Sequence, residues 1–460
     1  MMKRILSLLL ASALLLAGCA PMTVGGSDPA KNGRQEVQQT SYALARPVYP
    51  DFPAYPEEPQ GDDADWDAYF DAYSQYIKDL EAVRGQGLTE EHWAVLNAFT
   101  AKSTPLVLAE HEGENTVYSP LSLWSALAML AQCADGDSRQ QVLEAMGADS
   151  VDALQEQVPQ IWRGLYTDDG RSSLILANSI WLSDAAQGSY VQDTLDVLAQ
   201  KHFASVWSVP MGTDQADQAV TDWVAEQTNG LIGGEGPVVQ TKAETLALLA
   251  SSLYYKAAWQ DEFLPQLTEE DIFTTADGQE SRVDFMHQTQ DANFIRRDGY
   301  QAAQLSTQLG EMVFVLPDEG VAPESLLSEP DFLARLEFYG DAATWGEVQW
   351  SVPKFDVDSE LDLKGALSTL GVADLMDPDK ADLTALTDLD AFLSEVKQLA
   401  RVKVDEEGVE AAAVTMMTID CTSAMPEPDP EICVMDLDRP FLFIIRTQDV
   451  PLFVGIVNQV

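Results

Sequence analysis

The stretch that decides the fold lies near the C-terminus and reads Glu406-Glu407-Gly408-Val409-Glu410-Ala411-Ala412-Ala413-Val414, continued by Thr415-Met416-Met417-Thr418-Ile419-Asp420. Just before it, residues 400–405 alternate apolar and charged side chains, the period-two pattern of a half-buried strand. In the stretch itself, every odd-numbered position from 409 to 419 is uncharged, whereas Glu410 and Asp420 are even-numbered. The stretch can therefore form a further strand that buries one face without burying a charge.

The chain on either side of this stretch is unusual for a strand. Gly408 can adopt the backbone of a turn, so the chain can reverse there. Downstream, Pro426-Glu427-Pro428-Asp429-Pro430 is typical of extended, exposed chain. One interpretation is a strand followed by a turn. The other is a strand-competent segment that leads into an exposed loop, and the stretch alone leaves both open.

Motifs in the rest of the chain follow the order and spacing of one family. They are Asn115-Thr116-Val117-Tyr118-Ser119-Pro120-Leu121-Ser122-Leu123, Gly136–Arg139 with Leu143–Gly147, Asn178–Leu182, Trp223–Ile232, Leu253–Lys256 with Trp259 and Phe263, Val352–Phe355, Ala381–Thr384, Arg439–Phe443 and Pro451–Gly455. Residues 406–413 closely resemble the hinge of the serpin reactive loop. The whole set covers 89–460, and on it the sequence is identified as similar to the serpin family.

The fold class follows from the residues and from the resemblance together. Helical patterns dominate residues 122–145, whereas later runs are strand-like, a combination that predicts an α+β fold. The strand-like runs are Leu174–Leu182, Met312–Leu316, Val348–Val352, Leu399–Val404, Phe441–Ile445 and Leu452–Val457. The resemblance implies the serpin fold, with large central β-sheets, surrounding helices and an exposed reactive-centre loop at about 406–430.

The resemblance implies a suicide-type inhibitor of serine proteases. A target protease attacks the loop and forms an acyl-enzyme, and the freed hinge then inserts into the central sheet and traps the protease covalently. The hinge residues are Glu406, Gly408, Val409, Glu410, Ala411, Ala412, Ala413 and Val414, whose mostly small side chains favour insertion. Val409 stands where the family usually has threonine or serine. The alternative is a non-inhibitory serpin that acts as a surface binding protein.

Five further residues match the regions that the family calls the breach and the shutter. They are Ser119, Ser122, Ser251, Trp259 and Gln398. Ser251 replaces the usual shutter asparagine and Gln398 replaces the shutter histidine. Both remain polar, so we expect an alternative hydrogen-bond network.

The usual length of serpin loops places the reactive bond between Thr422 and Ser423, and because this loop is longer than usual on its downstream side, the candidate residues extend from Cys421 to Ala424. No lysine or arginine occurs from Val409 to Asp438, which predicts elastase-like or subtilisin-like targets over trypsin-like ones. Cys421 lies beside the predicted bond, and Cys433 follows twelve residues later. The two form either a disulfide or two independent thiols. The sequence leaves that choice open.

Composition and missing motifs exclude other classes of function. A formal net charge of −49 excludes a nucleic-acid-binding surface. No G-x-S-x-G or H-E-x-x-H motif occurs, and the four histidines lack metal-ligand spacing, so we predict no enzyme, catalytic residues, metal or cofactor. The expected partner is the target protease, and the expected state is a monomer.

The N-terminal part of the chain predicts export. Residues 1–18 have a basic start and a short apolar run, and Leu16-Ala17-Gly18-Cys19 looks like a bacterial lipobox with Cys19 as the lipidated residue. We expect the protein at the outer face of a bacterial membrane, on the cell surface. Proline-rich residues 19–60 predict a flexible tether, 61–88 an acidic amphipathic helix that leads into the body, and 89–460 the serpin domain.

Overall fold

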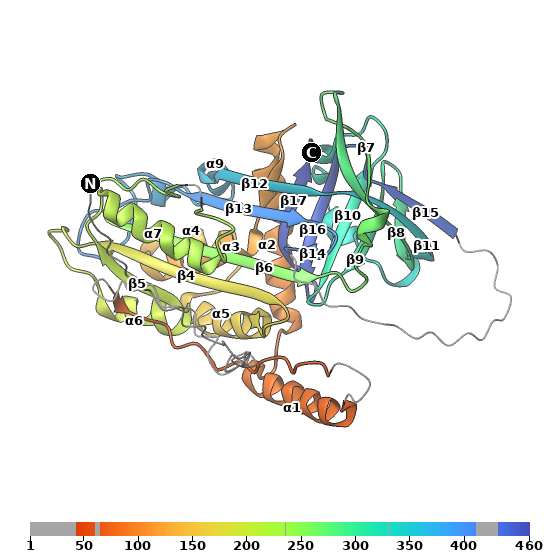
Figure 1. The fold of residues 1–460 in the computed structure, drawn as a ribbon. Helices are drawn as coiled ribbons and strands as arrows, with labels where there is room; N and C mark the ends of the chain where they lie inside the picture. The colour runs from red at the N-terminus through yellow and green to blue at the C-terminus, as the bar shows by residue number, and fades with distance from the viewer. Residues whose placement is uncertain (1–42, 60–64, 235, 330, 411–430) are drawn as a thin grey trace, which may run out of the picture. The chain divides into compact units, whose positions relative to one another are not determined.

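Two large β-sheets organise the chain in the computed structural model, which describes residues 43–59, 65–234, 236–329, 331–410 and 431–460 (Figure 1). The first sheet has the strand order β1-β5-β4-β6-β14-β13-β12, with β3 paired to β4. Its strands are β1 Ala43–Ala45, β3 Thr167–Asp168, β4 Ser173–Ser183, β5 Ala204–Val209, β6 Ala247–Ala258, β12 Phe355–Asp362, β13 Lys397–Val404 and β14 Gly408–Val409.

The second sheet has the order β15-β11-β8-β9-β10-β16-β17-β2, with β7 paired to β8. Its strands are β2 Thr116–Tyr118, β7 Glu269–Thr274, β8 Glu280–Arg297, β9 Tyr300–Ser306, β10 Glu311–Pro317, β11 Thr344–Pro353, β15 Glu431–Asp436, β16 Phe441–Thr447 and β17 Val450–Val457. The six strand-like runs of the sequence all fall inside these strands, so those predictions are confirmed.

Helices pack on both sheets. They are α1 Trp66–Arg84, α2 Glu90–Leu108, α3 Pro120–Cys133, α4 Gly136–Met146, α5 Val151–Leu165, α6 Gln192–Lys201, α7 Asp214–Gln227, α8 Pro323–Leu327 and α9 Lys364–Thr369. The Ser119 hydroxyl accepts from the Ser122 amide and caps α3, and Pro120 occupies its first turn. The helices and the two sheets make the α+β fold that the sequence predicts. None of the described helices combines the length and the hydropathy needed to cross a bilayer.

The first sheet buries a separate apolar layer beneath α7. Trp181 on β4 stacks on Trp207 on β5 with ring centroids 5.3 Å apart, and Trp223 on α7 meets Trp181 edge-on at 6.4 Å. Tyr254 on β6 belongs to the same cluster. The opposite face of β6 joins the main core with α3 and β17. Side chains of β6 therefore alternate between two buried layers.

Residues 43–59 differ from the flexible tether expected over 19–60. We refer to them as the strap, because they lie along the body and continue the first sheet through the pairing of β1 with β5. Tyr49 stacks on Trp162 of α5 with centroids 5.4 Å apart, and Phe52 contacts Tyr166 at 5.0 Å. Prolines keep the strap extended, as expected, but its aromatic side chains anchor it.

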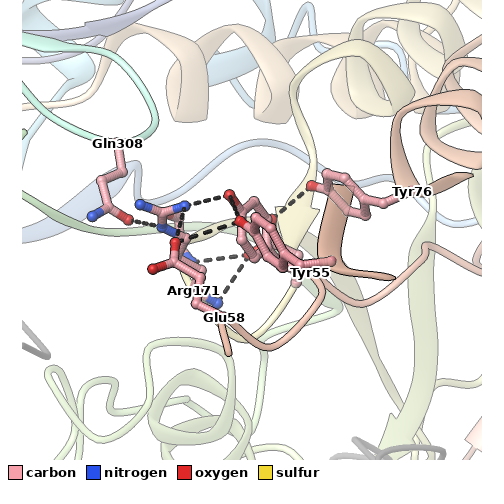
Figure 2. A network of polar contacts seen from close by, with 8 residues as sticks. Tyr55, Glu58, Tyr76, Arg171 and Gln308 are labelled. Atoms are coloured by element: carbon pink, nitrogen blue, oxygen red, sulfur yellow. Dashed lines mark hydrogen bonds and ion pairs between the residues drawn. The ribbon is translucent and has the colours of Figure 1, made fainter. Parts of the chain in front are cut away.

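The strap and α1 meet the body in the polar network of Figure 2. The Arg171 guanidinium lies over the Tyr55 ring, 4.6 Å from its centroid, and is 3.7 Å from the Glu58 carboxylate. It also donates to the Tyr55 hydroxyl and to the side chain of Gln308. From α1, the Tyr76 hydroxyl donates to the Asp169 carboxylate at 2.8 Å. Helix α1, predicted within 61–88, is thus docked on the body by hydrogen bonds.

Candidate functional site

Trp259 fixes the chain just ahead of the hinge. Its side chain is 1% exposed and packs edge-on against Phe263, with centroids 6.0 Å apart. Its indole N–H donates to the Asp405 carbonyl at 2.9 Å, and its amide donates to the Glu407 carbonyl at 3.0 Å. The turn that connects β13 to the hinge is therefore held at both ends by one buried tryptophan.

Glu406 is bound to two residues next to strands: Lys354, which links β11 to β12, and Thr268, which precedes β7. Its carboxylate lies 2.8 Å from the Lys354 ammonium and accepts a hydrogen bond from the Thr268 hydroxyl at 2.9 Å. Burial alone would raise the pKa of Glu406, but these bonds outweigh it and hold the pKa below its ordinary value. Lys354 stands in a family motif of the sequence. Neither it nor Thr268 could be identified from the sequence as the partner of Glu406, because more than 50 residues separate them.

Two residues of the hinge lie inside the first sheet. Gly408 pairs with Ala258, and Val409 pairs with Ala257 on β6 and with Val404 on β13. Val409 is 2% exposed. A Cβ at Gly408 would lie 2.4 Å from the Ala257 carbonyl oxygen, so only glycine fits at this point. The prediction of an exposed loop from about 406 is therefore wrong for Gly408 and Val409, which form β14.

Below β14 the first sheet is open. Within the described residues, β6 and β13 are joined only through β14, and no ladder runs directly between them. A cavity of about 790 Å³ lies there, with β6, β13 and α3 in its walls. Four predicted residues line it: Ser119, Ser122, Ser251 and Gln398. We call this cavity the slot.

Hydrogen bonds join three of the predicted shutter residues. The Gln398 amide oxygen accepts from the Ser119 backbone N–H at 2.7 Å, and its NH₂ donates to the Ser119 carbonyl at 2.8 Å. The Ser119 hydroxyl donates to the Ser122 hydroxyl at 3.2 Å. Ser251 lies across the slot on β6, where it pairs with Asn178 of β4. Gln398, which stands where the family usually has a histidine, therefore makes two neutral hydrogen bonds to the backbone of Ser119.

Several predicted residues lie outside the described part of the chain. They are Cys19, Ala411, Ala412, Ala413, Val414, Cys421, Thr422 and Ser423. Cys433 is described: it is buried in β15, where its thiol is 3.7 Å from the Gln301 side-chain oxygen. The described chain leaves the first sheet at Glu410 and enters the second sheet at Glu431. No group of described His, Cys, Asp or Glu side chains has the arrangement of a metal site.

Comparisons with known proteins agree with this geometry. The family model described as Serpin (serine protease inhibitor) matches residues 94–460. Serpin-ZXA of Oryza sativa subsp. japonica is 32% identical over 382 residues, which cover 78% of this chain and 94% of that protein. Serpin-Z2B of Triticum aestivum is 30% identical over 363 residues, which cover 74% and 89%.

A solved structure extends the likeness to three dimensions. The thermophilic serpin tengpin in its native state aligns with a TM-score of 0.71 and 26% identity, over 82% of this chain and 96% of that chain. The two-sheet fold, the hinge between β6 and β13 and the family match all lead to one assignment. The description of the family model is that of a protease inhibitor and not of an enzyme. The chain belongs to the serpin family.

Proposed function

We propose that this serpin inhibits serine proteases by covalent trapping. The observation that carries the proposal is β14: two hinge residues already occupy the first sheet, and the slot continues below them. Attack by the protease serine on the loop forms an ester and releases the downstream chain. The free hinge then completes the sheet faster than water hydrolyses the ester, and the protease is carried along.

The register of β14 supports a defined path for insertion. Continued antiparallel pairing would bring Thr415 level with both Ser251 on β6 and Gln398 on β13. Side chains at 409, 411, 413 and 415 would point toward the main core, as Val409 does. The Thr415 hydroxyl would then meet the polar residues of the slot. This path buries no charge on the core side.

We further propose an elastase-like or subtilisin-like target and a reactive bond at Thr422–Ser423. The absence of a cation from 409 to 438 supports this class, because a trypsin-like pocket requires one. Thr422→Arg should transfer inhibition to trypsin, whereas Glu427→Arg, five residues further on, should not. Efficient inhibition of trypsin by the unmodified protein would contradict the assignment.

The decisive test mixes residues 20–460 with pancreatic elastase and with subtilisin, followed by denaturing gels and N-terminal sequencing of the released peptide. We expect a band heavier than either partner and a new N-terminus at Ser423. Val409→Arg, which places a charge at a buried position of β14, should convert the inhibitor into a substrate that is cut but forms no such band. Cleavage without a complex in the unmodified protein with every protease of the two classes would favour a non-inhibitory binding protein.

Cys421 and Cys433 admit a redox test. Burial raises the pKa of the Cys433 thiol, which keeps it protonated and slow to react. We therefore favour two independent thiols. Inhibition rates with and without reductant should be equal, and a rate that changes with reductant would support a disulfide between the two.

We also propose that Cys19 carries a lipid and anchors the protein at the outer face of a bacterial membrane. The lipobox-like sequence supports this, and two or three acyl chains bind a bilayer firmly. Expressed in a bacterial host, the full chain should partition into the detergent phase and incorporate labelled fatty acid. Cys19→Ser should lose both properties, and Cys133→Ser should keep them; label on the Cys19→Ser variant would exclude this site.

A further inference from the structure

Glu410 occupies the position at which insertion stops in this structure. Its amide donates to the Lys403 carbonyl at 3.1 Å, so it still pairs with β13, but its pairing with β6 ends at Val409. Its φ is +44°, in the left-handed region that a residue with a Cβ rarely adopts. Backbone strain therefore coincides with the exact point where the chain departs from the slot.

Among the described residues the Glu410 side chain has one hydrogen-bond partner, and the Lys256, Lys403 and Arg401 cations already act on its charge from a greater distance. Oε1 accepts a hydrogen bond from the Tyr254 hydroxyl at 2.7 Å, whereas Oε2 is buried and has no hydrogen-bond partner among the described residues. Burial raises the pKa of this carboxyl group. The Asn229 amide donates to the same tyrosine hydroxyl at 3.4 Å. Tyr254 thus connects β6 to the hinge through a bond that the next step of insertion must rearrange.

The strand register specifies where Glu410 goes next. In an extended conformation it would stand level with Lys256 on β6 and Lys403 on β13, with all three side chains on the face opposite Val409. Lys403 now lies 3.3 Å from the Asp405 carboxylate. Arg401, two residues before Lys403, is held by the Asp356 carboxylate at 2.7 and 2.8 Å. The two lysines are therefore the cations at the level of Glu410.

We propose that Glu410 is a two-position latch that times loop insertion: bound to Tyr254 it holds the hinge after two inserted residues, and placed between Lys256 and Lys403 it stabilises the advancing strand. The proposal rests on the trapping function proposed above and deepens it. Glu410 acts as a positioning residue, because it does not touch the reacting ester. Tyr254 stabilises the first position, whereas Lys256 and Lys403 stabilise the second.

The test uses variants with opposite expected signs. Tyr254→Phe removes the hydrogen bond that holds Glu410 and should speed insertion about tenfold. The free energy of a hydrogen bond to a charged group typically corresponds to a rate change of about this size. Lys256→Gln leaves the holding bond intact and should slow insertion roughly twofold to threefold, with a larger effect when combined with Lys403→Gln. Tyr76→Phe is the matched control, because Tyr76 also donates to a carboxylate at 2.8 Å but on α1. It should leave the insertion rate unchanged.

Insertion is followed by tryptophan fluorescence after rapid mixing with a protease that cuts the loop, and its completion by the rise in the midpoint of thermal unfolding. This readout needs no trapped complex. A merely structural role for Tyr254 and Lys256 would shift both variants in the same direction and overturn the latch. Covalent complexes with equal insertion rates in all variants would also overturn it, while leaving trapping intact. Opposite shifts without any covalent complex would support the latch and reject inhibition.

Discussion

Arg171 and Tyr55 are joined twice: the guanidinium lies 4.6 Å from the ring centroid and also donates to the hydroxyl of the same tyrosine. Because Arg171 is mostly buried, this cation–π contact is partly desolvated. Another partner of Arg171, Gln308, donates its backbone N–H to the Ala258 carbonyl, and Ala258 pairs with Gly408 of the hinge. The strap is thus connected by contacts to the entrance of the slot.

We expect Arg171→Gln to lower the free energy of unfolding by about 2 kcal/mol, because it removes the cation–π contact and leaves Glu58 without its cation. Urea denaturation followed by circular dichroism measures the change. The control is Arg282→Gln, which breaks the exposed pair with Glu270 at 3.0 Å and should cost less than about 0.5 kcal/mol. Equal effects would mean that the strap adds nothing to stability.

His202 predicts a loss of stability in acid. It is 1% exposed, neither ring nitrogen has a hydrogen-bond partner in the part of the chain that the structure describes, and burial lowers its pKa to about 4. The neutral ring is therefore favoured in the fold, so its contribution is present above pH 6.5 and is lost as the pH falls from 6.5 through 4. The loss at pH 4 should reach roughly 3 kcal/mol.

Unfolding curves of the unmodified protein and of His202→Leu test this assignment over that range. The variant should lack the His202 part of the pH dependence, so the difference in stability between the two proteins should change steadily between pH 6.5 and 4. A constant difference would mean that His202 has an ordinary pKa in the folded protein.

Gln398 satisfies two backbone groups in the wall of the slot. Gln398→Leu keeps a similar volume but leaves the N–H and C=O of Ser119 unpaired and buried, which should cost roughly 3 kcal/mol of stability. Thermal unfolding of the uncut protein measures it. Gln349→Leu, at an exposed position on β11, should change stability by less than about 0.5 kcal/mol. A comparable midpoint for the two variants would show that water replaces the glutamine.

The pair of Lys354 and Glu406 should stabilise the breach at neutral pH. The depressed pKa of Glu406 means that its contribution is present above the ordinary pKa and is lost as the pH falls through the lower, folded value. Glu406→Gln should therefore cost about 1 kcal/mol at pH 7 and much less at pH 3. An undiminished difference at pH 3 would point to packing as the source of the effect.

Residue patterns predict the strands and helices of this chain well, because buried strands and amphipathic helices carry their own periodicity. The ordered motifs also bring Ser119, Ser122 and Gln398 to one place, although 276 residues separate Ser122 from Gln398. The position of Gly408 and Val409 could not be predicted. Whether they lie in the sheet depends on which segments pair with the edges of β6 and β13, and the local sequence pattern does not indicate this pairing.

The docking of the strap on the body is the second feature that differs from the prediction. The prolines predict extended chain correctly, but three residues per turn of such a chain place Tyr49, Phe52 and Tyr55 on one face. This spacing of aromatic residues can be seen in the sequence, and it indicates a segment that docks on another surface. The partner surface, formed by Trp162, Tyr166 and Arg171, could only be found from the fold.

The pairing of Ala43–Ala45 with β5 affects whether the protein self-associates after its N-terminal residues are removed. An uncovered sheet edge recruits strands from other molecules and promotes aggregation, and β1 is the segment that occupies this edge. A cut just before Ala43 would leave this edge of the sheet covered by β1. Removal of residues 43–59 would instead expose both the backbone amides of β5 and the ring of Trp162. A truncated protein that begins after the strap should therefore self-associate, whereas one that begins at Ala43 should remain dispersed.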